Sequence, residues 1–210
     1  MKTAAVFVHG LFLNGAEFTL LRSRLAAQHG FRTHRFSYPT VRGSMAGAVA
    51  QLTRFVDRIE AERVHFIGHS LGGIVLCRYF QCANPARDGR VVLLGAPVAG
   101  SSSARAVAKH GWLRRVIGPL VNAELVEDGE PRTWTCGREL GLIAGTRPMG
   151  LGRLFARMQE DSDGTVAVSE TKLPGHTAHL VLPVSHMGML TSARVARHVG
   201  GFLTEGRFEP

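Results

Sequence analysis

Residues 68–72, which read Gly-His-Ser-Leu-Gly, are the segment whose residue types and spacing most clearly indicate chemistry. They match the pattern G-x-S-x-G at a point where an apolar, strand-like run gives way to a segment of helical period. A serine on such a turn is held in strained backbone geometry, and the positive end of the following helix favours negative charge on its oxygen. Ser70 is therefore the candidate nucleophile for attack on an acyl carbon. The alternative is an N-capping serine in a glycine-rich turn.

A serine hydroxyl is a weak nucleophile at neutral pH, so it needs a base within reach and an acceptor that fixes the tautomer of that base. His186 follows a strand-like run and precedes a helical segment. This position places it on a loop at the carboxyl-terminal edge of a parallel sheet, where catalytic residues gather. His176 and His179 are alternatives, but they lie before or at the opposite end of that strand.

The acceptor is expected in the acidic loop between the last two predicted strands, and Asp163 is the candidate. Asp161 and Glu160 lie in the same loop and stay open as alternatives. An Asp-Gly turn would also explain Asp163 without catalysis, because aspartate bonds to its own backbone and glycine supplies positive φ. Glu170 is expected on the surface.

Elements that would position these residues follow from the hydrophobic pattern. Apolar runs alternate with longer segments of helical period, which is typical of an α/β protein with a mostly parallel sheet and helices on both faces. The predicted strands are residues 4–8, 33–37, 63–67, 90–94, 140–144 and 179–182. The predicted helices are residues 17–28, 45–61, 71–83 and 189–203. The chain length favours a single domain over residues 1–210.

From residue 100 to about residue 137 this pattern loosens, and we expect a small cap or insertion there. Within it, residues 101–126 carry an apolar face at helical spacing. Two interpretations stay open: a lid over the site, or ordinary helices that complete the core. The residues of that face are Trp112, Leu113, Val116 and Ile117.

Residues 68–73 resemble the nucleophile elbow of bacterial lipases and related esterases in the α/β-hydrolase superfamily. Residues 9–11, which read His-Gly-Leu, resemble the oxyanion loop of those lipases, and residues 94–97 resemble the segment that follows the next strand. The resemblance covers essentially the whole chain. It implies the α/β-hydrolase fold.

The resemblance also implies a triad in the order serine, acid, histidine, which Ser70, Asp163 and His186 follow. A serine hydrolase that cleaves acyl esters through an acyl-enzyme intermediate is the function this implies. A carboxylesterase or lipase-like enzyme acting on short or medium acyl chains fits best, because no leader, disulfide pair or evident calcium site of the secreted lipases is present. An acyltransferase, a thioesterase or an amidase would use the same groups, and a non-catalytic binding protein on the same fold is the alternative outside enzymes.

An oxyanion hole would be made by two backbone amides. The residue after the nucleophile, Leu71, supplies one of them. By its place in the His-Gly-Leu segment, Leu11 supplies the other, with Phe12 as the fallback. His9 is expected to brace this loop rather than to act in catalysis.

Apolar residues next to these positions are compatible with an acyl chain, although core packing explains each of them equally well. The predicted substrate-binding residues are Phe12, Leu13, Val98 and Met187.

The net charge of +9 comes from scattered basic residues without the aromatic-and-basic cluster of a nucleic-acid reader, so we expect no nucleic-acid partner. Cys77, Cys82 and Cys136 lack metal-ligand spacing, and we expect no metal and no cofactor. The absence of a leader and of a membrane-length apolar run predicts a cytoplasmic protein without stable membrane insertion. A small-molecule acyl ester is the expected partner, and the oligomeric state stays open.

Overall fold

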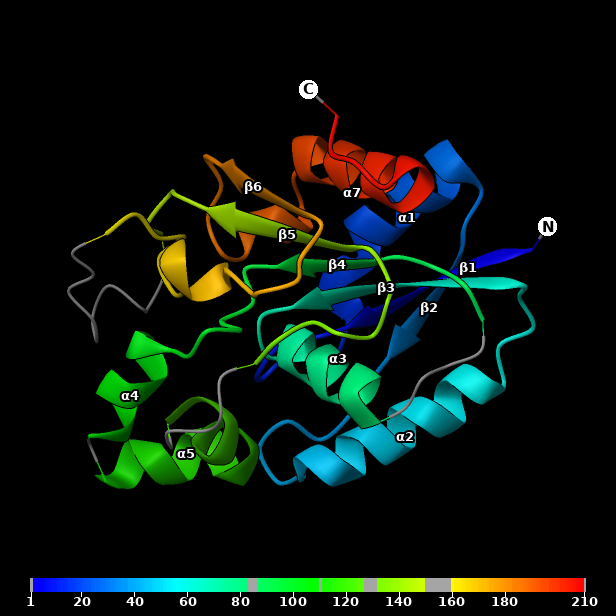
Figure 1. Ribbon diagram of the computed structural model, residues 1–210. Helices are drawn as coiled ribbons and strands as arrows, with labels where there is room; N and C mark the ends of the chain where they lie inside the picture. The colour runs from blue at the N-terminus through cyan, green and yellow to red at the C-terminus, as the bar shows by residue number, and fades with distance from the viewer. Residues whose placement is uncertain (1, 83–86, 110, 127–131, 150–159, 210) are drawn as a thin grey trace.

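Six parallel strands form one sheet in the order β2-β1-β3-β4-β5-β6 (Figure 1). The computed structural model describes residues 2–82, 87–109, 111–126, 132–149 and 160–209, without the side chains of residues 111–115. The predicted α/β architecture with a parallel sheet is confirmed. The strands are β1 (Thr3–Val8), β2 (Arg32–Phe36), β3 (Arg63–His69), β4 (Val91–Leu94), β5 (Leu140–Gly145) and β6 (Ala178–Leu182).

Helices cover both faces of this sheet. In Figure 1, α1 (Thr19–His29) and α7 (Ala193–Glu205) lie on one face, and α2 (Met45–Asp57) and α3 (Leu71–Cys82) lie on the other. Successive side chains of a strand point to opposite faces. β1 accordingly contributes Val6 and Val8 to the core under α2 and α3, whereas its residue Phe7 packs under α1 and α7.

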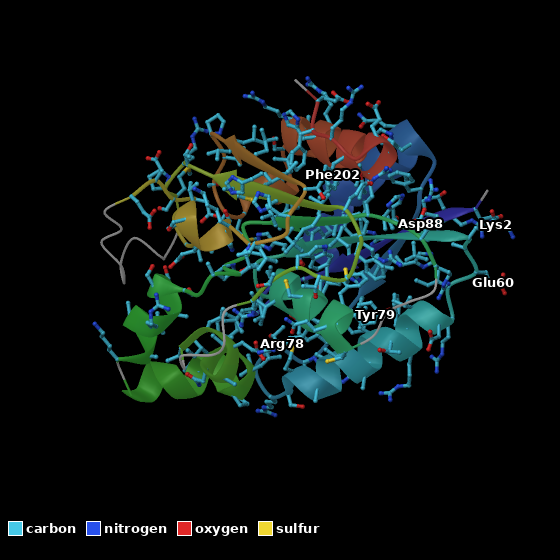
Figure 2. All side chains as sticks on the ribbon, in the orientation of Figure 1. Lys2, Glu60, Arg78, Tyr79, Asp88 and Phe202 are labelled. Atoms are coloured by element: carbon cyan, nitrogen blue, oxygen red, sulfur yellow. The ribbon has the colours of Figure 1, made fainter. Side chains whose placement is uncertain are left out.

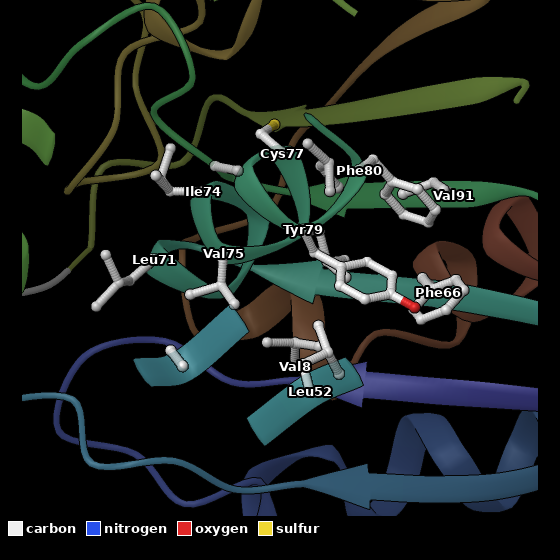
Figure 3. Close-up of a cluster of buried hydrophobic side chains, with 14 of the residues drawn as sticks. Val8, Leu52, Phe66, Leu71, Ile74, Val75, Cys77, Tyr79, Phe80 and Val91 are labelled. Atoms are coloured by element: carbon white, nitrogen blue, oxygen red, sulfur yellow. The ribbon is translucent and has the colours of Figure 1, made fainter. Parts of the chain in front are cut away.

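Helix α3, which begins directly after Ser70, is buried nearly all round, as its apolar sequence predicts, and Figure 3 shows its apolar side chains in the core. The rings of Tyr79 and Phe80 lie 5.7 and 5.1 Å from that of Phe66 on β3, measured between centroids. Its first turn approaches β1 so closely that a Cβ on Gly72 would lie 2.1 Å from the carbonyl oxygen of Val8. Only glycine permits this approach, which sets the start of α3 directly against the end of β1.

The strand order changes direction at β1, because β2 lies on one side of it and β3 and the later strands lie on the other. The helix after β1 packs on one face and the helix after β3 packs on the other. In open parallel sheets this reversal leaves a crevice outside the carboxyl ends of the two strands, which is where ligands bind. The loop after β1 and the turn after β3 meet at this edge of the sheet, because a Cβ on Gly10 would lie 3.0 Å from Ser70 Cβ. The labelled residues Lys2, Glu60 and Asp88 mark the opposite end of the sheet in Figure 2.

Helices α4 (Ser102–Ala108) and α5 (Gly111–Val121) and the π-helix η2 (Asn122–Val126) fall in the predicted cap region. In Figure 1 they lie on the side to which the strands' carboxyl ends point. Val116 is exposed, but Ile117 is buried, and the side chains of Trp112 and Leu113 lie outside those described. Within residues 101–126, the buried members of the main core are Ile117, Leu120, Val121 and Leu125. The second half of the cap therefore completes the core, as one of the two interpretations predicted.

A charged cluster ties the end of the cap to the sheet. The carboxylate of Glu124 in η2 accepts hydrogen bonds from Arg78 of α3 at 3.1 Å and from Arg132 at 2.8 Å. Arg132 also donates to the carbonyl oxygen of Val98, just after β4, at 3.2 Å. Both Glu124 and Arg132 side chains are 8% exposed, so these bonds are shielded from solvent and hold η2 in place.

Two predicted helix boundaries are wrong. The helix predicted over residues 45–61 ends at Asp57, where Arg87 donates to the carbonyl oxygens of Val56 and Ile59. The helix predicted to begin at residue 189 begins at Ala193, because the Ser192 hydroxyl caps it by accepting a hydrogen bond from the Val195 amide. In the described part of the chain, no helix has both the length and the apolar character needed to cross a membrane.

Candidate active site

The candidate acid Asp163 and the candidate base His186 meet beyond the carboxyl ends of β5 and β6. Asp163 Oδ2 lies 2.7 Å from His186 Nδ1, across 23 residues of sequence. The backbone pairs the same two residues a second time, since the His186 amide donates to the Asp163 carbonyl oxygen at 3.0 Å. Asp163 is fully buried and His186 is 8% exposed. A carboxylate only accepts when ionised, so Nδ1 carries the proton and Nε2 is left with the lone pair of a base.

The second oxygen of Asp163 holds its own loop. Oδ1 accepts the amide hydrogens of Thr165 at 2.9 Å and Val166 at 2.8 Å. The turn-forming and the imidazole-binding explanations of this aspartate are thus both realised, one on each oxygen. Glu160 and Asp161, the alternatives from the sequence, are exposed.

Ser70 sits at the junction of β3 and α3 with φ of 54°, in the left-handed region. Among the described residues only one other non-glycine residue, Phe12, has positive φ, at 60°. Such strain persists only where the surrounding structure enforces it, and it concentrates at functional sites. The Ser70 amide is tied to β4 by a 3.0 Å hydrogen bond to the Leu94 carbonyl oxygen. Its hydroxyl forms no hydrogen bond within the described part of the chain, so the contact with His186 stays a prediction.

Gly95 lies between the elbow and the acid–base pair. It follows Leu94, the residue that binds the Ser70 amide, and has φ of 52°. A Cβ there would lie 2.8 Å from Asp163 Oδ2 and 3.1 Å from His186 Nδ1. Any side chain would push the pair away from the elbow, so this glycine sets their separation. Its resemblance to the family segment marked it in the sequence, but its role emerges only from the structure.

The loop after β1 is braced by a buried histidine. His9 Nδ1 lies 2.9 Å from the Gly10 carbonyl oxygen, and its Nε2 accepts the Tyr38 amide at 3.3 Å. The Tyr38 hydroxyl donates to the His9 carbonyl oxygen at 3.0 Å, and the two rings stack with centroids 4.6 Å apart. Burial lowers the pKa of His9, which keeps the ring neutral and suited to one donor and one acceptor bond.

Two backbone amides beside Ser70 are available for an oxyanion. The Phe12 amide is engaged by the Thr40 hydroxyl at 3.3 Å, whereas the Leu11 amide donates to no group in the described chain. Leu71 is the first residue of α3, and the first amides of a helix have no acceptor inside it. A Cβ on Gly10 would lie 3.0 Å from Ser70 Cβ, so this loop and the elbow are in contact. The geometry therefore favours Leu11 over Phe12, and the pair Leu11 and Leu71 remains our prediction.

The predicted substrate-binding residues differ in exposure. Phe12 is 60% and Met187 is 47% exposed, and Leu13 is partly buried. Val98 is 1% exposed and belongs to the main core, where packing accounts for it. The accessible apolar candidates for substrate contact are therefore Phe12 and Leu13 on the loop after β1 and Met187 on the loop after β6.

The prediction that Glu170 lies on the surface is wrong. Its side chain is buried, and its carboxylate accepts the amide hydrogens of Ala167 at 3.0 Å and of Ser102 at the start of α4. Ser103 adds a 2.6 Å bond from its hydroxyl to the Thr165 carbonyl oxygen. Helix α4 is thereby joined to the loop that carries the candidate acid. No local signal in the sequence shows this, because the second partner lies 68 residues away.

Replacement of Glu170 by alanine is expected to lower the free energy of unfolding by about 2 to 4 kcal/mol, because the buried amide of Ala167 and the partly buried amide of Ser102 lose their acceptor. For a chain of this size the melting temperature would fall by roughly 5 to 15 °C in thermal unfolding. The matched control is Glu160→Ala in the same loop, whose exposed carboxylate accepts a hydrogen bond from the Ser169 hydroxyl and from no other group among the described residues. Equal melting temperatures for the two variants would contradict the bridging role of Glu170.

No metal site is evident in the described residues, where no three His, Cys, Asp or Glu side chains gather suitably. Burial raises the pKa of the Cys77 thiol to about 12, so it stays protonated in the core.

A parallel sheet with a strained serine at a strand–helix turn and a buried Asp–His pair defines an α/β-hydrolase. The sequence agrees: residues 5–198 match the Alpha/beta hydrolase family, and the chain belongs to it.

Solved structures with this fold include the mature form of a Bacillus licheniformis lipase, at 20% identity and a TM-score of 0.72 over 90% of this chain and 87% of that one. A metagenomic carboxyl esterase matches at 18% identity with a TM-score of 0.67, covering 88% of this chain and 64% of that one. Phospholipase PlaB from Legionella pneumophila matches at 15% identity with a TM-score of 0.73, over 94% of this chain and 56% of that one. No curated protein sequence matches. At these low sequence identities, the similarity to the solved structures shows the fold alone.

Proposed function

We propose that this protein is a serine hydrolase that cleaves carboxylic esters with Ser70, His186 and Asp163. The observation that carries the proposal is the 2.7 Å bond between Asp163 and His186, which fixes the His186 tautomer. Gly95, which packs against this pair, follows the residue that binds the amide of the strained Ser70. That arrangement supplies a nucleophile, a base and an orienting carboxylate in the roles that acyl transfer requires.

In the proposed reaction, His186 Nε2 removes the Ser70 proton while Oγ attacks the ester carbonyl carbon. The amides of Leu11 and Leu71 stabilise the resulting oxyanion, a contribution typically worth about 100- to 1000-fold in rate per donor. The imidazolium then protonates the leaving alcohol, which leaves an acyl group on Ser70. Water then attacks the acyl carbon while His186 takes its proton; the bond between that carbon and Ser70 Oγ breaks, the imidazolium returns the proton to Oγ, and the acid is released.

The choice of esters over other acyl compounds is supported by the names of structural neighbours, which are a lipase, a carboxyl esterase and a phospholipase. The exposed apolar side chains of Phe12 and Met187 suit the acyl part of such a substrate. We place the preference at short or medium acyl chains. Comparison of p-nitrophenyl esters of increasing length tests it, and a maximum at long chains would contradict it.

A fluorophosphonate probe tests the proposed chemistry itself. The probe is expected to attach to Ser70 Oγ with loss of fluoride, and hydrolysis of p-nitrophenyl butyrate is expected to disappear in step with labelling. Peptide mapping identifies the labelled residue. Folded protein that neither reacts with the probe nor hydrolyses the ester would instead be a binding protein. Faster turnover of an acyl thioester, or acyl transfer to an added alcohol in preference to water, would identify the thioesterase or acyltransferase alternative.

A further inference from the structure

A second histidine, which the proposed reaction does not use, lies beside the candidate base. His69 is the last residue of β3 and the neighbour of Ser70, and it has no exposed surface. Its ring contacts the ring of His186, with centroids 4.5 Å apart and planes at 45°. Phe18 stands edge-on to the same ring at 6.4 Å.

Within the described part of the chain, the His69 ring forms one hydrogen bond, and it goes to the backbone of the candidate base. Its Nε2 lies 3.1 Å from the carbonyl oxygen of His186. A carbonyl oxygen only accepts, so Nε2 must carry the proton and Nδ1 must be bare. Nδ1 is buried without a partner in the described chain. A buried nitrogen without a hydrogen-bond partner lowers the stability of the folded protein. Because His69 carries this cost, we look for its role in the site rather than in folding.

The ring is also neutral. Burial, followed by the nearby His186, lowers the pKa of His69 well below its usual value. A cation here would oppose the imidazolium that His186 becomes when it takes the serine proton. A neutral donor holds the carbonyl without this repulsion.

We propose that His69 is a positioning residue that fixes His186 for proton transfer, through its Nε2 hydrogen bond to the His186 carbonyl and its ring contact. His186 is then held at three points: its Nδ1 and its amide by Asp163, and its carbonyl by His69. Because His69 is adjacent to Ser70 in the chain, one rigid strand end positions both partners of the proton transfer. This inference rests on the proposed function of the site.

Three substitutions of His69 test the proposal. His69→Phe keeps a ring but removes the donor. His69→Gln places an amide nitrogen as many bonds from Cα as Nε2, so the donor is restored. His69→Asn places its nitrogen at the Nδ1 position, where it does not reach the carbonyl. We expect kcat for p-nitrophenyl butyrate to fall about 10- to 100-fold for Phe and Asn, as for small misplacements of a catalytic group, and to recover largely with Gln.

The split between kinetic constants separates positioning from folding. KM is expected to stay unchanged in all three variants, and the melting temperature of His69→Phe to stay near that of the unaltered protein, because phenylalanine also removes the unsatisfied Nδ1. A Phe variant as fast as the unaltered protein, or Gln and Phe variants equally slow, would overturn the proposal. Failure of the proposed function gives a different result, since the unaltered protein would then neither hydrolyse the ester nor react with fluorophosphonate.

Discussion

The Ser70→Ala variant is expected to hydrolyse p-nitrophenyl esters on the order of 10⁶-fold more slowly than the unaltered protein, the scale of loss when a catalytic serine is removed. The reason is that no other described hydroxyl occupies the elbow between β3 and α3. Steady-state kinetics with an active-site titration measures the loss, and the variant should no longer react with fluorophosphonate.

Stability provides the control for this variant. The Ser70 hydroxyl makes no hydrogen bond in the described chain, so its removal should leave the melting temperature nearly unchanged. Retention of a substantial part of the activity in folded Ser70→Ala would mean that another group is the nucleophile, and the proposed reaction would be abandoned.

The Asp163→Asn variant is expected to lose about 10⁴-fold in kcat. Asparagine Oδ1 can still accept the amides of Thr165 and Val166, so the loop should keep its shape. Its amide nitrogen, however, would face His186 Nδ1 as a donor. The imidazole would then take the tautomer with the proton on Nε2, and the base would be blocked.

Asp161→Asn is the matched control for this charge removal, because Asp161 is exposed and lies two residues away. It should keep the kcat of the unaltered protein under the same conditions. If the two variants lost activity equally, the loss would come from the charge of the loop rather than from the tautomer of His186.

The sequence predicted the sheet well because buried parallel strands are marked by their own residues. The apolar runs of β1, β3, β4 and β5 need no distant information to be recognised. The position of a helix end, in contrast, can depend on a residue that is remote in the sequence. The carbonyl-binding Arg87 that ends α2 lies about 30 residues from it, and no local pattern shows that. The start of α7 was predicted wrongly although its signal is local, since the capping Ser192 lies three residues before the amide it binds.

Within the candidate site, the sequence marked the candidate residues, including the Asp163–His186 pair that the structure brings together, more clearly than the contacts that hold them. Ser70 and His186 were marked by a motif and by their place after a strand. Glu170 was misjudged because a charged side chain is ordinarily exposed, and its partner on α4 is remote in sequence. The engagement of the Phe12 amide by Thr40 had no signal at all, since it depends on how two loops pack.

The candidate base, His186, follows β6, which is one of the two edge strands of the sheet. β6 pairs with β5 alone, and all its residues but Leu182 are at least partly accessible to solvent. Fraying on heating begins at such weakly held edges. Detachment of β6 would carry His186 off while β3, flanked by strands on both sides, kept Ser70 in position. We therefore expect the proposed activity to be lost on heating before the protein melts globally, since β6 pairs with one strand only.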